Sequence, residues 1–181
     1  MPLDSKILRD KIIANISGVI DPPTFHKKFA ETINEYIVSE AELVGNYIGI
    51  LTNKNPDPLS GIHKWKPISC KVDGAEILKA IDKIFDHNDF IVKYNKVLSN
   101  EIKEKTIFSG ISKDNTVTIG NVKILSMDIK MDMSSKPKKQ NDAVFVIADG
   151  IVNGIFNSIP EIFISATTLV GSGIVTFSKI E

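Results

Sequence analysis

The stretch EIFISATTLVGSGIVTFSKI, residues 161–180, decides the fold class of this chain. Its uncharged part, residues 162–177, is sixteen residues long, whereas a helix that spans a membrane needs about 20. The stretch is rich in threonine and β-branched residues, which favour strands, and its glycines favour a turn. We therefore expect paired strands over residues 161–168 and 173–180, joined around Val170-Gly171-Ser172.

Toward the N-terminus from this stretch, further periodic segments are expected. Asp142 caps a mostly buried helix over residues 143–158. Between residues 125 and 133 apolar and polar side chains alternate strictly, which is the period of a half-buried strand. Shorter strands are expected over residues 106–112 and 116–119. The side chains that the alternation directs toward the core or a subunit neighbour are those of Leu125, Met127, Ile129 and Met131.

The first forty residues predict a helical hairpin. Asp4-Ser5 caps a helix over residues 5–19, and Asp21-Pro22-Pro23 ends it because proline cannot continue a helix. Thr24 then caps a second helix, whose apolar residues recur at helical spacing. These residues are Phe25, Phe29, Ile33, Tyr36 and Ile37.

The middle of the chain mixes strands, loops and helices. Its expected elements are a strand over 44–52, a loop over 53–61, a strand over 62–72 that is irregular at Pro67, and helices over 75–85 and 90–105. The fold class is therefore α+β, with an N-terminal helical hairpin, central helices and an antiparallel sheet formed mainly by the C-terminal half. Residues 1–61 and 62–181 are expected to pack as one compact unit, because 181 residues suffice for a single core.

Composition excludes several classes of protein. The net charge is zero, with 43% apolar and 24% charged residues, which argues against disorder and against non-specific binding of nucleic acid. The single cysteine, Cys70, excludes a disulfide framework and a cysteine-rich zinc module. Arg9 is the only arginine, so recognition of carboxylate or phosphate by paired guanidinium hydrogen bonds is almost unavailable.

The residues that could carry chemistry form no recognisable site. His87 lies in Asp86-His87-Asn88-Asp89, but no other histidine or glutamate at a matching spacing completes a metal site, so we interpret this tetrapeptide as a turn at a helix end. His26 lies beside two lysines on a helix and is expected to be solvated. Cys70 fits a buried structural position better than a nucleophile. We therefore expect no catalytic residues, no metal and no cofactor.

Two basic segments admit a binding interpretation. His63-Lys64-Trp65-Lys66 combines a tryptophan with lysines and could stack a base or a sugar, although a strand edge protected by lysines explains it as well. A module for a small ligand or carbohydrate, centred on Trp65 and Tyr47, is therefore the alternative function. Lys136-Pro137-Lys138-Lys139 could touch phosphate, but a solvated loop is the simpler interpretation.

Two parts of the sequence resemble small virion structural proteins of contractile-tailed bacteriophages. In the first, an Ala-x-x-Ile helix, Ala30–Ile37, leads to Val44-Gly45-Asn46-Tyr47-Ile48-Gly49 and then to Pro56-Asp57-Pro58-Leu59-Ser60-Gly61. The second is Thr167-Thr168-Leu169-Val170-Gly171-Ser172-Gly173. The resemblance implies a non-enzymatic component of a tail, baseplate or neck. Its partners would be other virion proteins or copies of itself, without nucleic acid or membrane, in the virion and in the host cytoplasm during assembly.

The apolar C-terminal hairpin is the expected interface of such a homo-oligomer. Strand edges beside apolar side chains invite pairing with another chain, so the hairpin could add to a neighbour's sheet or fill its groove. Alternatively, it simply completes the protein's own sheet. The interface residues that we expect are Leu169, Val170, Gly171, Ser172, Gly173, Ile174 and Val175.

Overall fold

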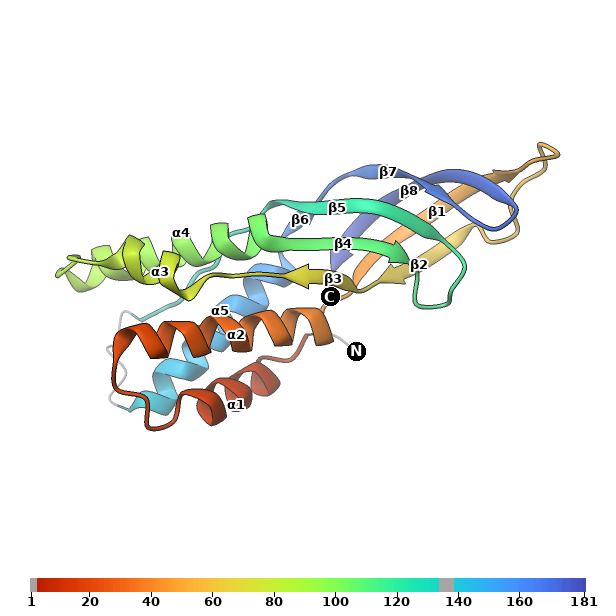
Figure 1. The fold of residues 1–181 in the computed structure, drawn as a ribbon. Helices are drawn as coiled ribbons and strands as arrows, with labels where there is room; N and C mark the ends of the chain where they lie inside the picture. The colour runs from red at the N-terminus through yellow and green to blue at the C-terminus, as the bar shows by residue number, and fades with distance from the viewer. Residues whose placement is uncertain (1–2, 134–138) are drawn as a thin grey trace.

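The computed structural model describes residues 3–133 and 139–181 and shows helices beside a long, curled sheet (Figure 1). The helices are α1 (Ser5–Ile16), α2 (Pro22–Glu40), α3 (Gly74–Ile81), α4 (His87–Lys105) and α5 (Gln140–Phe156). The strands are β1 (Leu43–Leu51), β2 (Gly61–Trp65), β3 (Pro67–Cys70), β4 (Thr106–Ile111), β5 (Thr118–Ser126), β6 (Ile159–Pro160), β7 (Phe163–Thr167) and β8 (Gly171–Ile180). The predicted α+β class is therefore confirmed, with most of the sheet contributed by the C-terminal half.

The sheet closes on itself through one short segment. Its strand order is β2-β1-β8-β7-β5-β4-β3 with antiparallel neighbours, and β6 pairs beside it with β5. The two end strands, β2 and β3, are separated in sequence only by Lys66. Residues 61–70 therefore pair with β1 through their first half and with β4 through their second. Along the seam, Lys113 N donates to Lys64 O at 2.8 Å and Trp65 Nε1 donates to Val117 O at 3.1 Å.

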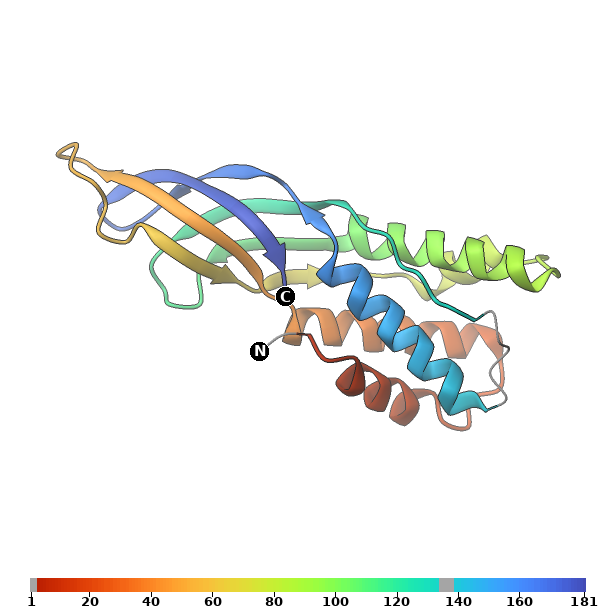
Figure 2. The same cartoon turned by 180° about the vertical axis from the view of Figure 1, so that it is seen from behind.

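The core fills the inside of the curled sheet and continues between the helices. Tyr47, Trp65 and Val175 are fully buried within the sheet, and Ile12 and Ile33 are fully buried in the helical part. Helices α1, α2 and α5 form a group under one end of the sheet, with α3 and α4 beside it (Figure 2). The opposite end of the sheet carries the β1–β2 and β7–β8 loops, which we call the distal end.

Helix ends differ from the expected ones where a different residue provides the cap. Helix α2 begins at Pro22 because Asp21, rather than Thr24, is its N-cap and accepts from Thr24 N at 2.9 Å. Proline is tolerated there, since the first turn needs no donor. Helix α4 likewise begins at His87, capped by Asp86. Helix α5 begins at Gln140, so Asp142 lies in its first turn and not at the cap.

Two helices end earlier than predicted. Helix α1 ends at Ile16, before Gly18, whose φ of 75° lies in the left-handed region. Helix α3 ends at Ile81, shortly before Lys83, whose φ is 63°. The apolar periodicity continues past both ends, because Val19 and Phe85 follow at helical spacing, but their backbone is no longer helical.

The predicted strand over residues 125–133 is wrong. Strand β5 ends at Ser126, and residues 127–133 pass α4 toward α5 without pairing as a strand (Figure 2). The alternation of burial nevertheless holds there, with Ile129 1% and Met131 5% exposed. Side chains of α4 replace strand partners, since Ile129 N donates to Ser99 Oγ at 2.8 Å. Leu125, by contrast, is 52% exposed and does not face the core.

Candidate functional site

Hydrogen bonds of Asp57 connect the long β1–β2 loop to the β7–β8 turn at the distal end. The Asp57 side chain is almost completely buried and accepts from three donors. Oδ2 accepts from Tyr47 Oη at 3.1 Å and from Thr168 Oγ1 at 2.9 Å, and Oδ1 accepts from Leu59 N at 2.9 Å. Burial acts to raise the pKa of Asp57, but these hydrogen bonds outweigh it and lower the pKa below its ordinary value.

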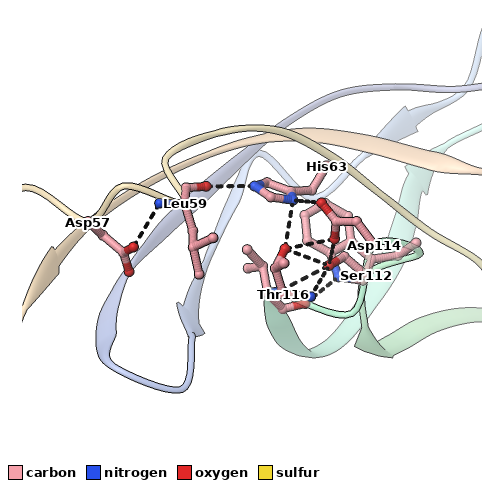
Figure 3. A network of polar contacts seen from close by, with 8 residues as sticks. Asp57, Leu59, His63, Ser112, Asp114 and Thr116 are labelled. Carbon is pink, nitrogen blue, oxygen red and sulfur yellow. Dashed lines mark hydrogen bonds and ion pairs between the residues drawn. The ribbon is translucent and has the colours of Figure 1, made fainter.

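A second polar network joins β2 to the β4–β5 turn (Figure 3). The nearly buried imidazole of His63 has Nδ1 at 2.8 Å from Asp114 Oδ2 and Nε2 at 2.8 Å from Leu59 O. Ser112 Oγ and Thr116 Oγ1 donate to Asp114 Oδ1 at 2.5 and 2.7 Å. Both ring nitrogens of His63 therefore contact oxygen atoms, so the ring is held from two sides.

This network is arranged to hold loops together. The Ser112 hydroxyl donates to Asp114 and itself accepts from Val117 N at 3.0 Å, so it is not directed at His63 as an activated nucleophile would be. Burial acts to raise the pKa of Asp114, but the hydrogen bonds from Ser112 and Thr116 and the charge of His63 lower it to about 2. The sequence indicates His63 only as part of the basic and aromatic segment 63–66, and no local pattern points to Asp114 as its partner.

Charged side chains gather at the end of the sheet near the helices. Glu42 is buried and forms ion pairs with Lys64 at 3.4 Å, Lys66 at 3.7 Å and Lys113. Burial acts to raise the pKa of Glu42, but hydrogen bonds from Lys113 and Lys64 lower it. Glu181 pairs with Lys64 and with Lys179 at 2.5 Å, and hydrogen bonds from Lys179 and Lys64 lower its pKa to about 2.

The outer face of the sheet presents large apolar side chains to solvent. Ile48 and Ile174 are register partners on β1 and β8 and are 67% and 50% exposed. Ile50 and Ile62 extend the surface along β1 and onto β2, and Phe163 extends it onto β7. Leu169 and Val170 adjoin it in the β7–β8 turn. We call these seven residues the outer apolar face: Ile48, Ile50, Ile62, Phe163, Leu169, Val170 and Ile174.

The positions between these side chains are small or polar and uncharged. One row across the sheet, from β2 to β7, reads Ile62, Asn46, Thr176 and Phe163. The next reads Ile48, Ile174 and Ser165, and the third reads Ile50, Ser172 and Thr167. Charge begins only in the row toward the helices, where Lys64 and Lys179 flank Val44. The outer apolar face is therefore an uncharged surface, bordered on one side by lysines that are ion-paired with Glu42 and Glu181.

The structure divides the predicted interface residues between surface and core. Leu169 is 98% exposed and Ile174 half exposed, but Val175 is fully buried in the sheet. Gly171 and Gly173 lie against β1, where a Cβ would come within 2.4 Å of Ile50 O and 2.2 Å of Ile48 O. Because β8 pairs with β1 on one side and β7 on the other, it has no free edge for a neighbour's sheet. The expectation that its edge is unpaired was wrong, and only its exposed side chains remain available.

The other candidates from the sequence lie in structural positions. Trp65 and Tyr47 are both fully buried, so neither ring offers a face to a ligand. His26 is also buried, contrary to expectation, with Nδ1 at 2.9 Å from Pro22 O. Cys70 is buried as predicted, and burial raises the pKa of its thiol. His87 contacts Met133 O through Nε2 at 3.3 Å. The basic segment 136–139 lies outside the described residues apart from Lys139.

A groove of about 1120 Å³ lies between α2 and α3 and is lined by residues of both signs of charge. Within the described residues, no three His, Cys, Asp or Glu side chains are grouped to hold a metal ion, and no helix has the length and apolarity to cross a membrane.

No family model, curated protein or solved structure matches this chain.

Proposed function

We propose that this chain is a structural or assembly protein that acts through protein–protein contacts, as a component of the tail, baseplate or neck of a bacteriophage particle. The observation that carries the proposal is the outer apolar face. Its exposed fractions amount to roughly 700–900 Å², taking roughly 150–200 Å² for a fully exposed large side chain. Exposed apolar patches on monomers usually measure about 300–600 Å², and larger ones mark interfaces.

The rigidity of the distal end supports the same function. Asp57 bonds the β1–β2 loop to Thr168, beside the exposed Leu169. His63 bonds that loop to the β4–β5 turn through Leu59 O and Asp114. A surface whose loops are already fixed loses little conformational entropy on binding, so more of the contact energy remains for assembly. The particle class rests on the resemblance of the Ala30–Ile37 helix and the glycine-spaced segments that follow it.

The alternative, a small-ligand or carbohydrate module centred on Trp65 and Tyr47, has less support. A ligand that stacks on an aromatic ring needs an exposed ring face. Both rings are buried, and their polar atoms are already used, Trp65 Nε1 by Val117 O and Tyr47 Oη by Asp57. Binding at this position would require opening of the core.

The experiment asks whether the chain is built into particles. Gradient-purified particles of the encoding phage should contain the chain in a fixed ratio to the other structural proteins, measured by quantitative mass spectrometry. Loss of the gene should give incomplete particles that the wild-type chain restores and the variant Val170→Asp/Ile174→Lys does not. Both positions are about half exposed, so this variant should keep its fold and melting transition. A chain found only outside particles would refute the proposal.

A further inference from the structure

The outer apolar face meets the requirements for pairing with an identical surface. Its exposed area of roughly 700–900 Å², if fully covered, equals the about 800 Å² per partner that a standard stable interface buries. Because its three rows carry no charge, a charged partner surface would lose hydration without gaining an ion pair. A second copy of this chain presents an uncharged apolar surface of the same extent.

The charged border of the face distinguishes two orientations of the two copies. Lys64 and Lys179 lie on the side of the face toward the helices. Both lysines form ion pairs within their own copy, with Glu42 and Glu181. If the strands of two packed copies ran in the same direction, these charged groups would be buried against each other at one end of the contact, which costs desolvation energy. If the strands run in opposite directions, the two borders lie at opposite ends of the contact. This second arrangement has a twofold axis that crosses the strands.

The rows of the face are complementary under that rotation. A twofold axis along the Ile48–Ile174 row places Ile48 opposite Ile48 of the second copy, and Ile174 opposite Ile174. The row on one side of the axis then lies opposite the row on the other side in the second copy. Phe163 then lies opposite Thr167 of the second copy, and Ile50 lies opposite Asn46, so large side chains meet small ones. Interdigitation of this kind is how the faces of two sheets pack about 10 Å apart.

We propose that the partner of the outer apolar face is a second copy of this chain, packed face to face about a twofold axis along the Ile48–Ile174 row. The inference rests on the proposed function, because it names the partner at the same surface. In this arrangement the Ile174 side chains of the two copies contact each other, and substitutions at this position can test that contact.

The test measures self-association by sedimentation equilibrium over about 1–100 μM, where dimers of micromolar affinity dissociate. The wild-type chain should be a dimer that dissociates on dilution. Ile174→Lys and Ile174→Asp should each weaken dimerisation by about 100-fold or more, because each buries two like charges at the axis. An equal mixture of the two variants should recover a heterodimer, since the opposite charges then meet. Ile68→Lys is the matched control, because Ile68 is 59% exposed on β3, outside the face, and should dimerise like the wild type.

Three results would overturn the inference: a wild-type chain that is monomeric throughout, an Ile174→Lys variant that dimerises normally, or a mixture that associates no better than either variant. Circular dichroism and thermal melting verify that each variant is folded, and Ile48→Lys replaces any that is not. The particle experiment separates the two proposals. A chain that is built into particles but monomeric in solution refutes only the self-pairing, and a dimer that is absent from particles refutes only the proposed function.

Discussion

Tyr47 shows how one residue can connect the core to the loops. Its ring is fully buried inside the sheet, and its hydroxyl donates to the buried carboxylate of Asp57. The sequence indicated Tyr47 only as part of an alternative ligand-binding centre with Trp65, and no local pattern indicates that its partner lies in the following loop. The contact depends on the path of that loop, which tertiary packing determines. The residues that hold the distal end together could therefore not be predicted from the sequence.

Replacing Tyr47 by phenylalanine tests this contact. Tyr47→Phe keeps the ring and removes one hydrogen bond to an ionised acceptor, which should lower the free energy of unfolding by about 1.5–3 kcal/mol in urea denaturation. Tyr94→Phe is the control, since its hydroxyl makes no hydrogen bond to the residues that the structure describes, and it should change stability by less than about 0.5 kcal/mol. Equal effects of the two substitutions would show that the Tyr47 hydroxyl contributes nothing.

Asp114 should make stability depend on acid. Its pKa is lowered from 3.8 to about 2 in the folded chain, so its contribution is complete above pH 4 and is lost as the pH falls toward 2. Asp114→Asn should therefore be less stable than the wild type at pH 6 and should lose less stability between pH 4 and 2. Urea midpoints measured across this range provide the comparison. Parallel pH profiles would show that Asp114 titrates alike in the folded and unfolded chains.

Among the elements, residues 127–133 show where periodicity misleads. Alternating burial is a property of any extended segment with a core on one side, and it does not require a neighbouring strand. Here the core side is formed by α4 and α5, and the backbone donors of Ile129 and Met131 go to Ser99 and Asn95. Sequence periodicity therefore predicted the burial of Ile129 and Met131 correctly, but it predicted the position of Leu125 and the type of element incorrectly. The helices and the C-terminal hairpin were predictable because caps, prolines and glycines mark them locally.

Two alanine substitutions separate the inner and outer parts of this region. Ile129→Ala should lower the free energy of unfolding by about 2–5 kcal/mol, because the side chain is 1% exposed and its removal leaves a cavity. Leu125→Ala should lower it by less than about 1 kcal/mol, because Leu125 is half exposed at the end of β5. The free energy of unfolding of each variant is measured by urea denaturation. Similar losses for the two would mean that residues 125–133 behave as one strand after all.

Helix α5 approaches this segment closely through a glycine. A Cβ added at Gly154 would lie 2.7 Å from Ile129 Cγ1 and 3.3 Å from Ile129 Cα. In an exposed helix, Gly→Ala stabilises by about 1 kcal/mol through higher helix propensity. Here Gly154→Ala should destabilise instead, by about 1–3 kcal/mol, because the added methyl group overpacks the contact. A thermal melting temperature above that of the wild type would contradict the close packing of α5 on Ile129.

In the whole molecule, the sheet connects the two halves of the sequence. Strand β1, from the first 61 residues, lies between β2 and β8, and residues 61–70 close the curled sheet through the Trp65–Val117 hydrogen bond. Without residues 1–61, β2 loses its β1 partner and β8 keeps only β7, and β1 by itself has neither of its neighbours. This order of strands is set by pairings distant in the chain, which local patterns do not encode. The sequence therefore predicted the class of the fold and the hairpins, but not the closure.

The closure implies that sheet and helices unfold together. Trp65, the single tryptophan, is fully buried at the seam, so its fluorescence reports the opening of the sheet, and ellipticity at 222 nm reports the helices. The two signals should give coincident urea transitions, as two-state unfolding requires, because α1, α2 and α5 share one core with the sheet. The separate fragments 1–61 and 62–181 should each lack cooperative unfolding. A fluorescence transition that precedes the loss of helix would show that the sheet and the helical group are independently stable units.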